Sequence, residues 1–105
     1  MQIELLVGNT MNVLLEALAY EDGAYINDAG TATVTITDSS GEDVAGQAWP
    51  FALTYVPASN GNYTGVLSSV IQLVKGRKYT VEVTAIKDGN VGLWRQTVIA
   101  IERAF

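Results

Sequence analysis

A glycine turn followed by a strictly alternating segment is the feature that most constrains how this chain folds. It occupies residues 73–85, where Gly76 lies between Leu73 and Tyr79. From Tyr79 onward, apolar and polar residues alternate. The apolar positions are Tyr79, Val81, Val83 and Ala85, and the polar positions are Thr80, Glu82 and Thr84. A period of two places apolar and polar side chains on opposite faces of a β-strand. The segment therefore predicts a turn that leads into a strand with one buried face.

The tyrosine that opens this strand resembles the tyrosine corner of immunoglobulin-like and fibronectin-like sandwiches. In that motif a tyrosine entering a late strand forms a hydrogen bond with the backbone just upstream. The resemblance implies structural roles for Tyr79, Gly76 and Leu73.

Further short extended runs, separated by turn residues, predict an all-β sandwich. Residues 31–37 alternate threonine with apolar side chains, and residues 38–41 form a turn sequence. Residues 49–55 predict one strand by the shared parity of its aromatic and leucine side chains, and Pro50 indicates an edge, a strand start or a bulge. Residues 63–67 predict another short strand.

The Asp-Gly pair within residues 87–90 predicts a hairpin, because it supplies the positive φ angles that a tight turn requires. The closing strand then extends over residues 93–102. Its segment 98–101 is apolar on both parities. This pattern leaves two interpretations open: a strand covered on both faces, as in a subunit contact, or a register shift at a bulge.

The first third of the chain is the most ambiguous. Residues 11–20 contain helix formers that are also candidates for a buried strand, and we interpret them as a strand because their neighbours are strands. Residues 1–10 are interpreted as an N-terminal arm or short strand, since Gly-Asn-Thr separates them from the next apolar segment. Residues 11–105 are predicted to form the sandwich domain.

Composition and charge limit the classes of function. Apolar residues make up 49% of the 105 residues and charged ones 16%, which is typical of one compact domain. The net charge of −5 disfavours nucleic-acid binding, because polyanions are repelled at neutral pH. The apolar run within residues 1–8 is too short for a signal peptide or a membrane span. We therefore expect cytoplasmic synthesis and no membrane partner.

The chain contains no cysteine and no histidine. This excludes Ser-His-Asp and Cys-His nucleophiles and zinc sites with nitrogen and sulfur ligands. The acids that lie beside glycine, asparagine or serine in predicted turns are Asp22, Asp28, Asp38, Glu42, Asp43 and Asp88. Solvated turn acids are the simpler interpretation, and calcium bound by the aspartates is the alternative, although none has EF-hand spacing. We predict no enzymatic activity and no cofactor.

Aromatic side chains supply a second candidate function, since flat rings on a sheet suit sugar rings. Trp49 has the parity of a core residue, whereas Trp94 precedes Arg95 and is a candidate for a position over an edge. Trp94 and Tyr25 are therefore the candidate ligand contacts for a glycan.

Sheet edges supply the candidate protein interface, because their free N–H and C=O groups can pair with another chain. The two segments expected to do so are residues 3–7 and residues 98–101. The candidate interface residues are Ile3, Leu5, Val7, Val98, Ile99 and Ile101.

Six segments in order carry a wider resemblance. They are residues 21–29, 33–41, 44–50, 61–67, 76–85 and 92–95. Their order and spacing resemble small immunoglobulin-like proteins encoded among the structural genes of tailed phages and prophages, and immunoglobulin-like modules of larger surface and fibre proteins. The resemblance covers about residues 11–103.

This resemblance implies an immunoglobulin-like, fibronectin III-like antiparallel sandwich of about seven strands. It also implies a non-enzymatic, virion-associated structural role, with synthesis in the bacterial cytoplasm and no catalytic residue. The expected partners are a second copy in a homo-oligomer or other virion proteins. The alternative is a carbohydrate-binding or adhesion module of the same fold.

Overall fold

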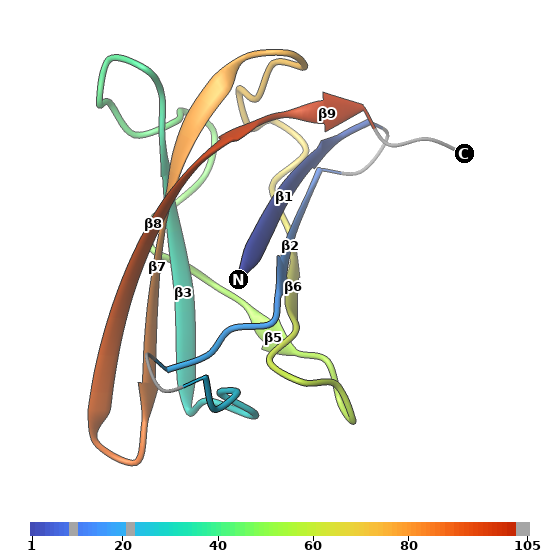
Figure 1. Cartoon of the computed structure of the whole chain (residues 1–105). Coiled ribbons are helices and arrows are strands. Elements are labelled where there is room, and N and C mark those ends of the chain that lie inside the picture. Colours follow the sequence, from blue (N-terminus) through green and yellow to red (C-terminus); the bar gives the residue numbers. More distant parts are fainter. Residues whose placement is uncertain (9–10, 21–22, 103–105) are drawn as a thin grey trace.

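Two β-sheets packed face to face make up the structure, a computed structural model that describes residues 1–8, 11–20 and 23–102 (Figure 1). One sheet contains β1 (Gln2–Val7), β2 (Asn12–Glu16), β5 (Thr54–Tyr55), β6 (Tyr63–Val66) and β9 (Ile101–Glu102), in the order β5-β6-β2-β1-β9. The other contains β3 (Thr31–Thr37), β4 (Phe51–Ala52), β7 (Lys78–Lys87) and β8 (Asn90–Ile99), in the order β4-β3-β7-β8. The predicted all-β sandwich is confirmed, and no helix that could cross a membrane occurs in the described residues.

The core lies between the sheets and is formed by the apolar parity of each strand. In β3 the inward side chains are Ala32, Val34 and Ile36, and in β7 they are Tyr79, Val81, Val83 and Ala85. These two strands pair antiparallel over the whole length of β3, with Val34 opposite Val83. The threonines of β3 remain on the outer face, as the alternation predicts.

Within the segment 11–20, Asn12–Glu16 form strand β2, so the strand interpretation is confirmed there and a helix is wrong. The strand ends where Ala17 adopts a left-handed backbone with φ of 57°. The Ala17 N–H donates to the side-chain oxygen of Asn62, at 3.0 Å. Next along the chain, Leu18 donates to the carbonyl of Gly61 at 2.9 Å, and this loop closes one end of the sandwich.

The first residues of the chain form a strand, β1, rather than an arm. β1 pairs antiparallel with β2 and parallel with β9, where Leu6 lies opposite Ile101. It therefore has a strand on each side and belongs to the same sandwich. Residues 9–10, 21–22 and 103–105, which the predicted domains include, lie outside the described residues.

The strand predicted over residues 49–55 is split between the two sheets. β4 pairs with β3 in one sheet, and β5 pairs with β6 in the other. The chain changes sheets at Leu53, which is buried and donates its N–H to the Ala32 carbonyl at 2.8 Å. Pro50 directly precedes β4, an edge strand, in agreement with the predicted strand start or edge.

A second change of sheet occurs near the end of the described chain. Figure 1 shows β8 following β7 and then bending over to β9 beside β1. The break falls at Ala100, whose N–H donates to Arg77 and whose carbonyl accepts from Gly76. One continuous segment therefore ties the two layers together.

Candidate interaction surface

The outer face of the β7–β8 hairpin carries the largest exposed apolar side chains of the smaller sheet. Val91 is 69% exposed, Leu93 56% and Ile86 38%. The pairing of the two strands sets Ile86 opposite Val91, and Thr84 opposite Leu93. These three apolar side chains, Ile86, Val91 and Leu93, gather near the hairpin turn, and we call them the tip patch.

The turn geometry determines which backbone groups of β8 face outward. Asp88 and Gly89 have φ of 51° and 80°, which is the conformation of a two-residue hairpin turn. In such a hairpin the flanking residues Lys87 and Asn90 form a hydrogen-bonded pair, and every second residue repeats it. The residues between them direct N–H and C=O away from β7. These residues, Val91, Leu93, Arg95 and Thr97, form what we call the β8 edge.

No strand in the described part of the chain pairs with the β8 edge. The edge has a single charged side chain, Arg95, whose Nε donates to Glu82 across the hairpin at 2.7 Å. Both side chains are partly solvent-exposed, so this ion pair adds little stability. It does neutralise the charge on the outer face. The result is a long open edge on which Val91 and Leu93 are apolar and the charge of Arg95 is paired.

Trp94 faces inward and is not an exposed platform. The side chain is partly buried and packs against the core. A Cβ built at Gly92 would lie 2.1 Å from an atom of the Trp94 ring, so the indole occupies the space above Gly92. The Trp94 ring therefore does not lie exposed over an edge, where the prediction placed it as a ligand contact. The absence of a side chain at position 92 provides the room for the ring.

Tyr25 is exposed, at 49%, in the loop that precedes β3. Its backbone forms an isolated antiparallel bridge with Ala19. The structure thus presents one of the two predicted glycan contacts on the surface and uses the other for packing.

The N-terminal half of the predicted interface is wrong. Ile3 and Leu5 are buried core residues, with exposures of 5% and 0%, and Val7 is partly buried against the same core. The prediction took β1 to be an edge strand, but β2 pairs along it from Gln2 to Leu6 and β9 pairs with its end, Leu6 and Val7. The Ile3 N–H is also satisfied, by the side-chain oxygen of Gln96 at 3.1 Å.

The residues in the C-terminal half of the predicted interface lie on two opposite faces of the strand. Val98 packs partly against the core and Ala100 is buried, whereas Ile99 and Ile101 are 51% and 45% exposed. Period-two alternation continues through this segment, so its apolar character on both parities reflects one inward and one outward row. Ile99 and Ile101 stay candidate interface residues.

The Tyr79 hydroxyl accepts a hydrogen bond from the Val74 N–H at 2.8 Å, the upstream backbone contact that the sequence predicts. Leu73 is buried in the core, and Gly76 has the left-handed φ of 86°. Because Gly76 also donates to the Ala100 carbonyl, at 2.8 Å, the turn holds the point where the last strand changes sheets. Tyr79, Leu73 and Gly76 therefore lie together at this turn, and their structural roles stay a prediction that Tyr79→Phe tests.

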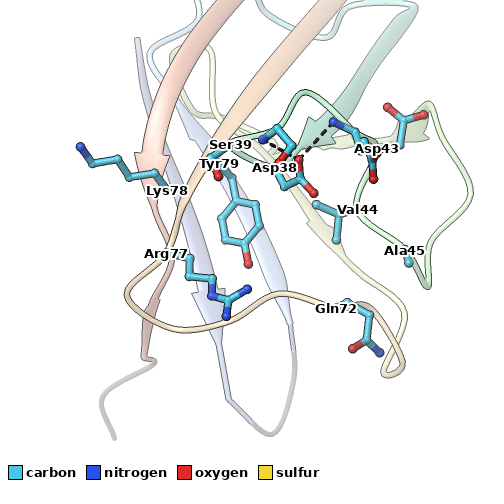
Figure 2. A pocket seen from close by; sticks show the side chains of 11 residues that line it. Asp38, Ser39, Asp43, Val44, Ala45, Gln72, Arg77, Lys78 and Tyr79 are labelled. Carbon is cyan, nitrogen blue, oxygen red and sulfur yellow. Dashed lines mark hydrogen bonds between the residues drawn. The ribbon is translucent and has the colours of Figure 1, made fainter.

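A hollow of 690 Å³ lies beside this turn, between residues 38–45 and residues 72–79 (Figure 2). Figure 2 shows the Tyr79 ring entering it from β7, while Lys78 points away. The Asp38 carboxylate accepts from the N–H groups of Ser40 and Glu42, at 2.9 and 3.1 Å. The Asp38 carboxylate therefore already accepts hydrogen bonds from backbone N–H groups of its own turn.

The described aspartates of the other predicted turns do not form a cluster that could hold a metal ion. In the described ranges, no three acidic side chains are placed to share a metal ion. Asp22, one of the candidate calcium ligands, lies outside the described residues.

Tyr63 is a structural residue that sequence reasoning placed in a strand without assigning it a role. Its hydroxyl donates to the Ile26 carbonyl and accepts from the Ala29 N–H, each at 2.9 Å. The side chain is 2% exposed, and burial raises the pKa of its hydroxyl above the ordinary 10.0. Tyr63 therefore fastens the loop before β3 to the larger sheet. Its Gly-Asn-Tyr-Thr-Gly context gives no signal for this contact.

Comparisons with protein-family models, curated proteins and solved structures found no match to this chain. The functional argument therefore depends on the geometry of its own residues.

Proposed function

We propose that this chain is a non-enzymatic, virion-associated structural protein with an immunoglobulin-like fold, which acts by binding protein, either a second copy or another virion component. The single observation that carries the proposal is the β8 edge, an open row of backbone donors and acceptors lined by Val91 and Leu93. Such edges are sites of strand addition. A chain that functions alone in solution is expected to shield an edge of this kind.

The immunoglobulin-like part of the proposal is supported by strand order. If β1 to β8 are lettered A, B, C, C′, D, E, F and G, one sheet has the order D-E-B-A and the other C′-C-F-G. Immunoglobulin sandwiches combine an A-B-E-D sheet with a C-F-G sheet. The hydrogen bond between Tyr79 and Val74 stands at the start of the strand lettered F, which is the position of a tyrosine corner. An experimental structure with another strand order would contradict this assignment.

The alternative, a carbohydrate-binding or adhesion module, has weaker support. It depended on Trp94 and Tyr25 as exposed rings, and Trp94 packs on Gly92 instead. The test is tryptophan fluorescence with iodide and with sugars. A sugar-dependent shift in emission would favour the alternative over a purely structural role.

The virion association is tested by quantitative mass spectrometry of purified particles from the source phage or induced prophage. We expect the protein in particles at a fixed ratio to the major structural proteins after density-gradient purification. A protein found only in the soluble lysate would contradict the proposal. A variant with Val66→Lys, an exposed position on β6 at 61%, provides a surface-change control that should still be incorporated.

A further inference from the structure

We infer that the β8 edge pairs with the β8 edge of a second copy, antiparallel about a two-fold axis, so that the smaller sheets of the two copies become one continuous sheet. This inference rests on the proposed function, because it specifies the partner and the strand through which the chain binds protein. It assigns the contact to Val91, Leu93 and Arg95 of each copy.

The chemistry of the β8 edge requires an extended strand as its partner. The N–H and C=O groups of Val91, Leu93 and Arg95 face away from β7, and only another strand can satisfy them in series. Natural sheets shield an open edge with proline, bulges, charged side chains on the edge or inward-pointing charges. The edge charge of β8, Arg95, is paired with Glu82. β8 contains no proline, and its inward-facing residues, Gly92, Trp94, Gln96 and Val98, carry no charge. The edge is therefore built to be paired.

Edge length favours a second copy as the partner. A strand that adds to β8 must itself present a free edge of similar length. The other edge strands of the described chain are β4, β5 and β9, and each has two residues, whereas β8 has ten. Among these edge strands of the described residues, β8 alone is long enough to match β8. An interface that uses the same strand on both copies is isologous, so it closes as a dimer and does not extend into a filament.

Charge determines the register. A two-fold axis at Arg95 would set the arginines of the two copies opposite each other, which is unfavourable. An axis at Leu93 sets Leu93 opposite Leu93 of the second copy and Val91 opposite the methylene stem of Arg95. It also joins the two tip patches.

The experiment measures the mass of the full chain by sedimentation equilibrium over a wide concentration range. Wild type should approach twice the mass of 11.2 kDa. Leu93→Lys should stay monomeric because it places one lysine from each copy at the two-fold axis, and the dissociation constant of the dimer should rise at least about tenfold. Val66→Lys, the matched control, should dimerise as wild type does. Leu93→Pro removes an outward N–H and should also be monomeric. Circular dichroism verifies that each variant retains its β-spectrum.

Cysteine cross-linking tests the register, since the natural chain has no cysteine. Directly opposite residues of a hydrogen-bonded antiparallel pair have Cα atoms about 5.5 Å apart, within disulfide range. Leu93→Cys should therefore give a disulfide-linked dimer on oxidation, whereas Thr97→Cys and Val66→Cys should not. A dimer cross-linked through Thr97→Cys and not through Leu93→Cys would overturn the register.

The second copy as partner is overturned if wild type is monomeric at every concentration, or if Leu93→Lys and Leu93→Pro still dimerise. A monomeric wild type whose Leu93→Lys variant is lost from particles would identify a different virion protein as the partner of β8. That outcome leaves the proposed function intact. Absence of wild type from particles, with a dimer in solution, would contradict the virion role and leave the dimer standing.

Discussion

The Trp94 ring occupies the space that a side chain at Gly92 would fill, with a built Cβ only 2.1 Å from the indole. Both residues lie on the inward face of β8, the strand whose outer face and edge form the candidate interface. The smallest residue on this strand thus lets the largest one fold back toward the core. This contact removes an aromatic from the surface while the outer row of β8 stays apolar.

Gly92→Ala should displace the Trp94 ring. Because the added methyl cannot share the space with the indole, we expect a red shift in tryptophan emission and stronger quenching by iodide. Gly30→Ala is the control, since the nearest atom to its Cβ is 3.7 Å away, an ordinary contact. Unchanged fluorescence in Gly92→Ala would show that the ring is held elsewhere.

Tyr79→Phe should lower the free energy of unfolding by about 1–3 kcal/mol, measured by urea denaturation. The change removes the acceptor of the Val74 N–H and leaves the ring in the core. Tyr25→Phe, at an exposed position, is the control and should be close to neutral. Equal stability of the two variants would remove the structural role of the Tyr79 hydroxyl.

Tyr63→Phe should destabilise the chain by about 2–4 kcal/mol, because two buried backbone groups, of Ile26 and Ala29, lose their partner. The substitution should also change how the free energy of unfolding falls as the pH rises above 10.0. Burial raises the pKa of folded Tyr63 above 10.0, so its contribution is complete below pH 10.0 and is lost as the pH rises through the folded pKa.

The measurement is the free energy of unfolding against pH for both proteins. Wild type should lose stability more steeply above pH 10.0 than Tyr63→Phe, since only wild type carries the Tyr63 hydroxyl. Parallel curves would mean that the Tyr63 hydroxyl ionises as easily in the folded chain as in the unfolded one.

Gly61→Ala should cost at least about 2 kcal/mol more than Gly41→Ala. Both glycines have left-handed φ, 72° and 84°, and each substitution incurs a backbone cost of about 1–2 kcal/mol. Only at Gly61 would the new Cβ also overlap the Leu18 backbone, 2.4 Å from its carbonyl oxygen. Thermal or urea unfolding of the two variants checks the difference, and similar losses would argue against the close packing of this loop.

Alternation along single strands allowed much of the fold to be predicted. β3, β7 and the Asp88–Gly89 turn follow from local sequence, because a period of two and a positive φ are properties of adjacent residues. Which strands lie side by side is not a local property, because it depends on residues that are distant in sequence. The sequence of β1 is compatible with an arm, and only its pairing with β9, distant in sequence, makes it an internal strand.

The two changes of sheet left no trace in the pattern. At Leu53 and Ala100 the chain passes from one layer to the other around a shared core, so inward side chains stay inward and the parity is unbroken. For the candidate site, sequence identified apolar character around residues 98–101, whereas the exposed part of β8 at Val91 and Leu93 required the strand order.

The parallel pairing of β1 with β9 has a mechanical consequence. Leu6 and Val7 lie beside Ile101 and Glu102, and the two strands run in the same direction. Tension applied between residue 2 and residue 102 would slide one strand lengthwise past the other, loading their hydrogen bonds together instead of opening them one after another. The short clamp at β9 would thus be the first structure to bear a stretching force.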